Sequence, residues 1–293
     1  MKEKGKLNFI SAMLIFSSIG IFVRALPYES SFIAFVRGIV GFAVILLFML
    51  FRRQKSDRKA IRENLVLLVV SGIFIGINWV ALFESYRYTT VATATLCYYM
   101  APMFVILASP VAFKERLTLK KVLCLITALI GMLFVSGVLE SGGGEIQLKG
   151  IIYGLVAAAF YASVMILNKK MTYIPAFDKT YIQLFCAAAI VGVYNIFTVD
   201  FAALSTDVKH ILLLLFVGAF HTGFAYTLYF GSMKSMKAQS IAILSYIDPV
   251  FALVLSAIIL KENMSLFGII GAVMVLGAAL VCDLPEKRKQ CKI

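Results

Sequence analysis

The sequence predicts an all-α polytopic membrane protein with ten transmembrane helices, arranged as two inverted repeats of five helices. Composition is the first observation behind this fold class. Of the 293 residues, 61% are hydrophobic and only 15% are charged, and the mean hydropathy is +0.94. Soluble domains average about 45–50% apolar and about 25% charged residues. A soluble fold could not bury so much apolar surface, so lipid is the expected solvent for most of it.

Apolar segments of membrane-spanning length are the second observation. A helix of about 20 residues crosses the hydrocarbon core of a bilayer. The segments lack the alternation over about ten residues that a membrane β-barrel requires. We expect helices at residues 8–26, 31–51, 65–87, 91–113, 118–138, 150–168, 179–198, 209–231, 238–260 and 265–283.

The first segment resembles the core of a signal peptide, because Lys2, Lys4 and Lys6 precede it. It continues to Arg24 without a small-residue cleavage site, and nine more apolar segments follow. We therefore interpret it as a retained first helix.

Basic residues predict the orientation of the helices. If the N-terminus is cytoplasmic, 22 of the 28 lysines and arginines lie on the cytoplasmic side, in agreement with the positive-inside rule. Short loops and basic flanks without a targeting extension favour a prokaryotic plasma membrane, with both termini cytoplasmic. The same distribution explains the net charge of +13 through topology and anionic membrane lipid, so no nucleic acid partner is expected.

An internal repeat is the third observation. Residues 98–115 align without a gap with residues 245–262, at a constant spacing of 147. Six of the eighteen positions are identical: Tyr99 and Tyr246, Pro102 and Pro249, Phe104 and Phe251, Ser109 and Ser256, Lys114 and Lys261, and Glu115 and Glu262. An odd number of helices in each repeat makes the second repeat enter the membrane from the opposite face, as in many secondary transporters.

The repeat also predicts the division of the chain. Residues 1–138 form the first five-helix unit and residues 150–285 the inverted second unit. Between them, residues 139–149 form a glycine-rich linker. Residues 286–293 form a basic cytoplasmic tail.

Two segments resemble the EamA-type transporters of the drug/metabolite transporter superfamily. They are YRYTTVATATLCYYMAPMFVILASPVAFKERLT (residues 86–118) and SMKSMKAQSIAILSYIDPVFALVLSAIILKENMS (residues 232–265). Arg37, in AFVRGIVG, matches an arginine often found in the second helix of that family. The resemblance implies a carrier or exporter of small metabolites, amino acids among them, that is either proton-linked or facilitated. Glu84, in ALFESYRY, departs from the pattern, because a small or apolar residue is expected there.

Asp248 is the first candidate site residue, because an ionisable group inside an apolar helix is costly and marks function. It lies about ten residues into its helix, beside Pro249. Proline distorts a helix and leaves carbonyls free to line a cavity, so Pro249 and its repeat counterpart Pro102 predict distortions near the midplane. Burial favours the protonated carboxyl, which makes Asp248 the predicted proton or substrate-cation site. An acid satisfied by hydroxyls or helix-end amides is the alternative.

Arg37, Glu84 and His221 are the other ionisable candidates. Arg37 and Glu84 form either a structural ion pair or a cation and an anion that bind the carboxylate and ammonium groups of an amino acid. His221, among the small residues of GAFHTGFAY, is either a packing element or a proton relay.

Aromatic residues related by the repeat are candidates for lining a pocket. Trp79 corresponds to Tyr226, and Tyr99 corresponds to Tyr246. Such rings stack on aromatic or cationic substrates. Ordinary packing or an interfacial position is the alternative.

Patterns for catalysis or cofactors are missing from the sequence. The five cysteines have no CxxC spacing, and HExxH, GxSxG and Walker A patterns are absent. We therefore predict no enzyme, no metal and no cofactor, and we expect a small-molecule substrate, lipid and protons as partners. The alternatives are a nucleotide-sugar or lipid-linked sugar carrier and an intramembrane enzyme. Gly72 and Gly76 form a GxxxG pattern that favours close packing and leaves a dimer as an alternative.

Overall fold

A computed structural model describes residues 2–114, 118–135, 145–233, 247–262 and 265–283, and within these ranges it is helical without strands. In chain order the helices are α1 (Lys2–Arg24), α2 (Ser30–Phe51), α3 (Arg58–Glu63), α4 (Leu65–Tyr88), α5 (Val91–Tyr98), α6 (Ala101–Phe113), α7 (Leu119–Val135), α8 (Glu145–Lys170), α9 (Ala176–Thr198), the 3-10 helix η1 (Phe201–Ala203), α10 (Val208–Phe216), the π-helix η2 (Val217–Phe224), α11 (Ala225–Met233), α13 (Ile247–Ile259) and α14 (Leu266–Asp283).

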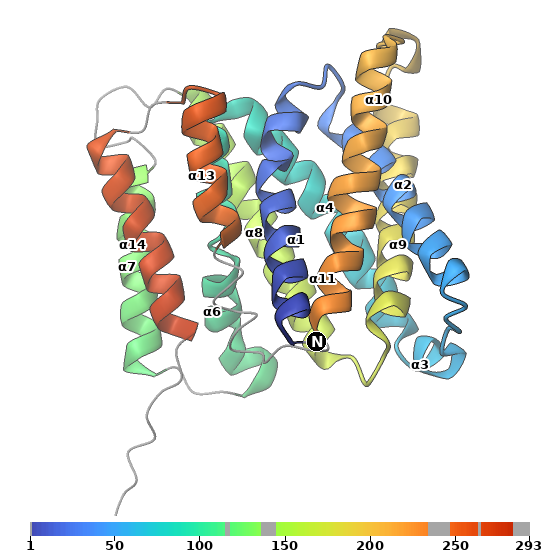
Figure 1. Cartoon of the computed structure of the whole chain (residues 1–293). Coiled ribbons are helices and arrows are strands. Elements are labelled where there is room, and N and C mark those ends of the chain that lie inside the picture. Colours follow the sequence, from blue (N-terminus) through green and yellow to red (C-terminus); the bar gives the residue numbers. More distant parts are fainter. Residues whose placement is uncertain (1, 115–117, 136–144, 234–246, 263–264, 284–293) are drawn as a thin grey trace, which may run out of the picture.

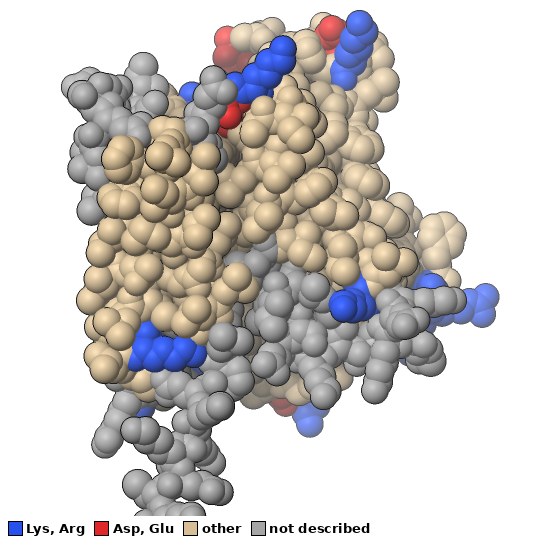
Figure 2. Space-filling view, turned by 60° about the vertical axis from the view of Figure 1, so that its left-hand side comes forward, with Lys and Arg blue, Asp and Glu red and all other residues tan. Residues whose placement is uncertain are grey.

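The fold is that of a multi-pass membrane protein. Within the described ranges, seven helices are long and apolar enough to cross a membrane, while α13 and residues 266–278 of α14 form shorter apolar helices. The predicted count of ten is not reached there. The segments expected at 118–138 and 238–260 extend outside the described residues, and the segment expected at 265–283 contributes only the shorter apolar helix at 266–278. Charged side chains gather at the two ends of the molecule, with an uncharged band between them (Figure 2), as a bilayer requires.

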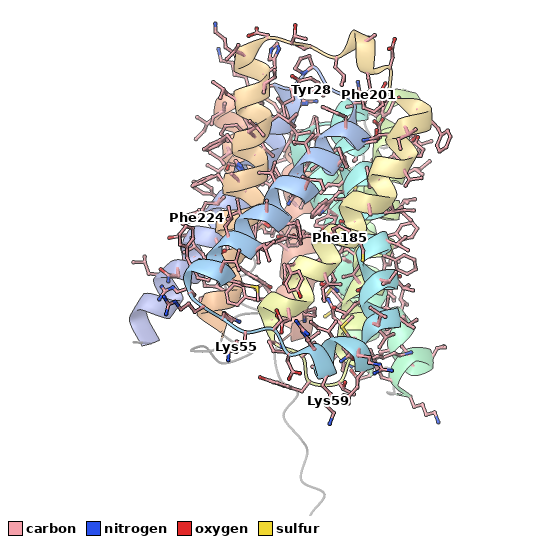
Figure 3. The ribbon with its side chains drawn as sticks, turned by 90° about the vertical axis from the view of Figure 1, so that its right-hand side faces the viewer. Tyr28, Lys55, Lys59, Phe185, Phe201 and Phe224 are labelled. Carbon is pink, nitrogen blue, oxygen red and sulfur yellow. The ribbon has the colours of Figure 1, made fainter. Side chains whose placement is uncertain are left out.

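The band between the two ends carries exposed apolar side chains. Phe185 and Phe224 project from the sides of the bundle (Figure 3) and are 52% and 45% exposed. Lys55 and Lys59 lie at one end of the bundle, whereas Tyr28 and Phe201 lie at the other (Figure 3). Exposed rings at mid-height are stable where lipid surrounds the protein and would be unusual in water.

Helix direction alternates along the chain and is inverted between the halves (Figure 1). In Figure 1, α1, α4 and α7 run upward, whereas α2 and the α5–α6 pair run downward. In the second half, α8, the α10–α11 run and α14 go downward, whereas α9 and α13 go upward. Each helix of the second half thus runs opposite to its counterpart in the first half.

The two halves pack through one another rather than side by side. The most extensive contacts between elements join α4 to α8 and α9, α2 to α9 and η2, α1 to α11 and α13, and α7 to α14. Each of these pairs combines a helix of the first half with a helix of the second. The buried interior, which includes Ile33, Phe83, Leu184 and Val217, therefore belongs to both halves.

Gly72 shows why small residues are needed at these contacts. A Cβ atom at Gly72 would lie 2.5 Å from Cys186 Cβ and 2.8 Å from the Gln183 carbonyl oxygen. The backbones of α4 and α9 approach closely at this point, which membrane helices achieve with small residues. Gly277 of α14 is different, because no atom lies within 4 Å of such a Cβ.

We expect Gly72→Ala to destabilise the protein by about 1–3 kcal/mol, because the added methyl overpacks a rigid contact. Thermal unfolding of the purified protein in detergent measures the change. Gly277→Ala is the matched control and should leave the unfolding temperature unchanged. Equal unfolding temperatures for the two variants would contradict the close α4–α9 contact.

Candidate functional site

Arg37 lies at the centre of the bundle, where α2 faces α4 and η2. The residue is only 6% exposed. Its guanidinium carbon lies 4.3 Å from the centroid of the Trp79 ring and 5.6 Å from that of Phe83, within the range of cation–π attraction. Its Nε donates a hydrogen bond to Thr222 Oγ1 at 2.6 Å. Rings of the first half and a hydroxyl of the second half therefore hold the guanidinium together.

The charge of Arg37 has no anionic partner in the described part of the chain. No described aspartate or glutamate forms an ion pair with Arg37. Its Nη1 and Nη2 groups make no hydrogen bond to any described residue. A buried charge is expensive unless it is paired. Nη1 and Nη2, which have no partner among the described residues, are therefore available to an anionic ligand. Two parallel N–H groups of a guanidinium bind a carboxylate in a bidentate manner.

Glu84 does not join this centre, so the structural ion pair with Arg37, one of the two alternatives for these residues, is not formed. The Glu84 carboxylate lies 3.3 Å from Arg87 Nη1, one turn further along α4, and its side chain is 21% exposed. The physical reason is helix rotation. One residue turns the side chain by about 100°, so Glu84 points away from the guanidinium that Phe83 contacts.

Asp248 lies in the first turn of α13 and is partly buried. Tyr99 donates a hydrogen bond to Asp248 Oδ2 at 2.7 Å. Tyr99 sits where the fourth helix is interrupted, between α5 and α6. Pro102 lies in the first turn of α6, directly after this interruption, and the buried Pro249 lies in the first turn of α13. The contact thus joins helix ends from the two halves.

Tyrosines connect the surroundings of Arg37 with those of Asp248. The phenol of Tyr86 lies close enough to interact electrostatically with both charged groups, and Tyr98 and Tyr226 lie similarly close to Arg37. The Tyr226 ring also lies edge-on to Phe16 at 5.4 Å. A cation and an acid therefore lie near the same tyrosine, Tyr86. The repeat counterpart Tyr246 lies outside the described residues.

Tyr161 belongs to a row of tyrosine rings that leads to the partner of Asp248, Tyr99. Its ring stacks on Tyr98 at 5.0 Å, and Tyr98 in turn meets Tyr99 edge-on at 6.1 Å. Stacked and edge-on rings hold each other in a defined orientation. The row of rings runs from α8 to the interruption between α5 and α6.

His221 lies one residue before Thr222 in η2 and is fully buried. Its Nε2 lies 3.0 Å from Ser18 Oγ of α1, and its ring lies 4.8 Å from the Phe22 ring. Within the described residues its Nδ1 has no hydrogen-bond partner. π-helices often mark functional positions, and this one brings neighbouring residues against both α1 and α2.

A second polar cluster closes the end of the bundle that holds Tyr28. Arg24 of α1 forms an ion pair with Glu262, which follows α13. The Glu262 carboxylate also accepts a hydrogen bond from Ser256 and one from the Val91 amide at 3.2 Å. The start of α5 is thus tied to α1 and α13. We refer to Arg24, Ser256 and Glu262, with the Val91 amide, as the end cluster.

A pocket of about 430 Å³ opens beside the end cluster. Its lining includes Arg24, Ile33 and Tyr86. Tyr86 also lies near the guanidinium of Arg37, so one side chain borders both the pocket and the centre. A larger hollow of about 650 Å³ lies between α7 and α14, and its lining includes none of the candidate residues.

Several residues of the site were not predicted from the sequence, and they are Ser18, Tyr86, Tyr161, Thr222 and Glu262. Thr222 and Tyr161 lie in segments without an unusual pattern. Glu262 could have been selected from the sequence, because it is identical to Glu115 at the corresponding position of the first repeat. In the described ranges, no three His, Cys, Asp or Glu side chains gather in a way that could hold a metal ion.

The fold and the site define a helical membrane protein with charged groups enclosed between two inverted halves. Comparison with known proteins identifies the family. The sequence model of the EamA-like transporter family matches residues 3–137 and again residues 148–282. The chain therefore belongs to the EamA-like transporter family, and it is a multi-pass membrane transporter.

Relatives of similar length support this assignment. The uncharacterized transporter YxxF of Bacillus subtilis is 28% identical over 95% of this chain and 89% of its own length. An uncharacterized transporter of Archaeoglobus fulgidus is 27% identical over 94% of this chain and 95% of its own length. A solved crystal structure has the same fold, with a TM-score of 0.66 at 18% identity and 96% of each chain covered.

We expect Glu262→Gln to destabilise the protein by about 1–3 kcal/mol, because the end cluster loses its ion pair and a charged acceptor. Thermal unfolding in detergent measures this change. Glu84→Gln is the matched control, since its ion pair is partly exposed and such pairs contribute about 0–1 kcal/mol. A Glu262→Gln variant as stable as Glu84→Gln would rule out a structural role for the end cluster.

Proposed function

We propose that this protein is a secondary transporter that moves a small carboxylate-bearing metabolite, an amino acid or a related compound, across the plasma membrane by alternating access. One observation carries the proposal: the Arg37 guanidinium is buried between the two halves, yet its Nη groups have no partner in the described residues. A carboxylate is the natural bidentate partner of such a group. We also propose that both termini are cytoplasmic, because this orientation places most lysines and arginines on the cytoplasmic side.

Asp248 supplies the complementary charge. Tyr86 lies near both Asp248 and Arg37, and the Asp248 carboxyl group accepts a hydrogen bond from Tyr99. An ammonium group of an amino acid or a coupling proton fits this position. The bond to Tyr99 also satisfies the structural alternative, in which a neighbouring hydroxyl compensates the acid. Transport measurements therefore have to separate the two roles.

Alternating access is supported by the contacts between the halves. Inverted halves that pack through one another can rock about a shared central site, so that the site opens to each face in turn. The end cluster joins α1, α5 and α13 across this interface. Opening of the bundle at that end requires the Arg24–Glu262 ion pair to separate.

A carrier of nucleotide sugars or lipid-linked sugars is the alternative substrate class, because a phosphate also binds the free edge of an arginine. An intramembrane enzyme has weaker support. Ser18 and His221 lie at hydrogen-bonding distance, as a nucleophile and base would. However, in the described residues no third group orients His221 through its Nδ1, and a dyad needs such a group.

The proposal is tested with purified protein in liposomes that contain a pH-sensitive dye. Amino acids, other carboxylates and nucleotide sugars are added one at a time, and labelled substrates detect transport that moves no proton. Uptake or exchange of carboxylates supports the proposal. Transport restricted to nucleotide sugars would replace it with the alternative class.

We expect Asp248→Asn to abolish the substrate-dependent pH change while the protein remains folded, because the amide cannot exchange a proton. The pH-sensitive dye provides the measurement. Tyr99→Phe, which leaves the carboxyl group in place, should retain a pH change. Full activity of Asp248→Asn with an unchanged pH response would eliminate Asp248 as the coupling site.

We expect Arg37→Gln to reduce carboxylate transport at least about a hundredfold, because losing a charge-assisted bidentate contact costs about 3 kcal/mol or more. Initial rates of labelled substrate uptake measure the loss. Arg62→Gln, which removes an exposed arginine of α3, is the control and should transport normally. Comparable rates for Arg37→Gln and Arg62→Gln would remove Arg37 from the site.

A further inference from the structure

We propose that Thr222 is a positioning residue for Arg37. Its hydroxyl fixes the orientation of the guanidinium, so that the edge formed by Nη1 and Nη2 stays free and faces the ligand. This inference rests on the proposed function, in which Arg37 binds the carboxylate of the substrate. It assigns a role to a neutral residue of the second half that acts only through the arginine of the first half.

The contact between the two side chains is short and enclosed. Arg37 Nε donates to Thr222 Oγ1 at 2.6 Å, and Thr222 is fully buried. Within the described residues this is the one hydrogen bond of the Arg37 side chain to another residue. Hydrogen bonds to charged groups in a low-dielectric interior are stronger than neutral ones. Thr222 therefore dominates the polar contacts that hold Arg37.

Backbone geometry places Thr222 within reach of Arg37. Thr222 lies in the π-helix η2, whose extra residue per turn alters the direction of its side chains compared with an α-helix. The facing position on α2 is Gly41. A Cβ atom there would lie 2.5 Å from Thr222 Cγ2, so only glycine lets α2 approach η2 this closely. A glycine of the first half and a π-helical segment of the second half therefore meet at this contact.

Two constraints then determine the orientation of the guanidinium. The group is planar, with one N–H on Nε and four on Nη1 and Nη2. Thr222 holds Nε, and Trp79 contacts the group at 4.3 Å with Phe83 further away at 5.6 Å. The remaining edge presents two parallel N–H groups, which match the two oxygens of a carboxylate. Without Thr222 the plane could rotate about the arginine stem, and this edge would lose its direction.

Simple packing is the competing role for Thr222, and two substitutions separate it from positioning. Thr222→Val keeps the shape and the methyl group beside Gly41 but removes the hydroxyl. Thr222→Ser keeps the hydroxyl but removes the methyl group. A positioning role predicts that valine is damaging and serine is tolerated. A packing role predicts the reverse.

Trp79 offers a readout that needs no ligand, because it is the single tryptophan of the chain and its ring faces the guanidinium of Arg37. We expect Thr222→Val to shift the tryptophan emission spectrum in the same direction as Arg37→Gln, whereas Thr222→Ser matches the wild type. Thr227→Val is the matched control, since Thr227 donates to the Gly223 carbonyl at 2.8 Å instead. A Thr222→Val spectrum identical to that of the wild type would overturn the proposal.

Transport supplies the second readout. For a carboxylate that the wild type moves, we expect Thr222→Val to raise KM about tenfold, which corresponds to about 1.4 kcal/mol, because the guanidinium loses a hydrogen bond to a charged group. The maximal rate should change much less, and Thr222→Ser should restore KM. If Thr222→Val does not fold, Thr222→Ser still decides: a loss equal to that of Arg37→Gln would refute positioning through the hydroxyl.

The outcomes keep the two proposals apart. If the wild type transports no carboxylate, the proposed function fails, and the Trp79 spectra still decide whether Thr222 positions Arg37. If the wild type transports a carboxylate and Arg37→Gln abolishes it, the proposed function stands. Thr222→Val with wild-type KM and a wild-type spectrum then overturns the positioning role alone.

Discussion

The free energy of keeping the Arg37 guanidinium in the membrane interior constrains the centre of this protein. A charge at such depth is stable only if dipoles, rings or a counter-ion replace the water that it loses. The described residues supply two aromatic faces and one hydroxyl, but no carboxylate. Among the described residues the site thus lacks an anion, and this deficit is the basis of the proposed carboxylate binding.

Stabilisation of the Arg37 charge depends on how the two halves of the bundle pack together. Trp79 and Phe83 come from the first half, whereas Thr222 comes from the second, so the guanidinium is stabilised only when the halves are interleaved. The same interleaving joins Tyr99 to Asp248. In the proposed alternating access, a relative movement of the halves would change the surroundings of both charges at once.

The end cluster and the centre use electrostatics differently. Glu262 is surrounded by donors, namely Arg24, Ser256 and the amide at the start of α5, so its charge is fully compensated. Arg37 has no carboxylate partner in the described part of the chain. A saturated cluster suits a structural contact that forms and breaks as a unit, whereas an unsaturated one suits a binding site. Tyr86 lies at the boundary, because it lines the pocket beside the end cluster and approaches the guanidinium of Arg37.

The sequence by itself determined the helical membrane fold, the inverted order of the halves and the family resemblance, because hydropathy and repeats are properties of contiguous segments. It also singled out Arg37, Trp79, Asp248 and Tyr99, since charges and rings in apolar helices are conspicuous. Only the tertiary structure decided the partners. Arg37 meets Thr222 across 185 residues and Arg24 meets Glu262 across 238, whereas Glu84 turns to its neighbour Arg87. Such pairings depend on the rotation and close approach of packed helices, which no local pattern encodes.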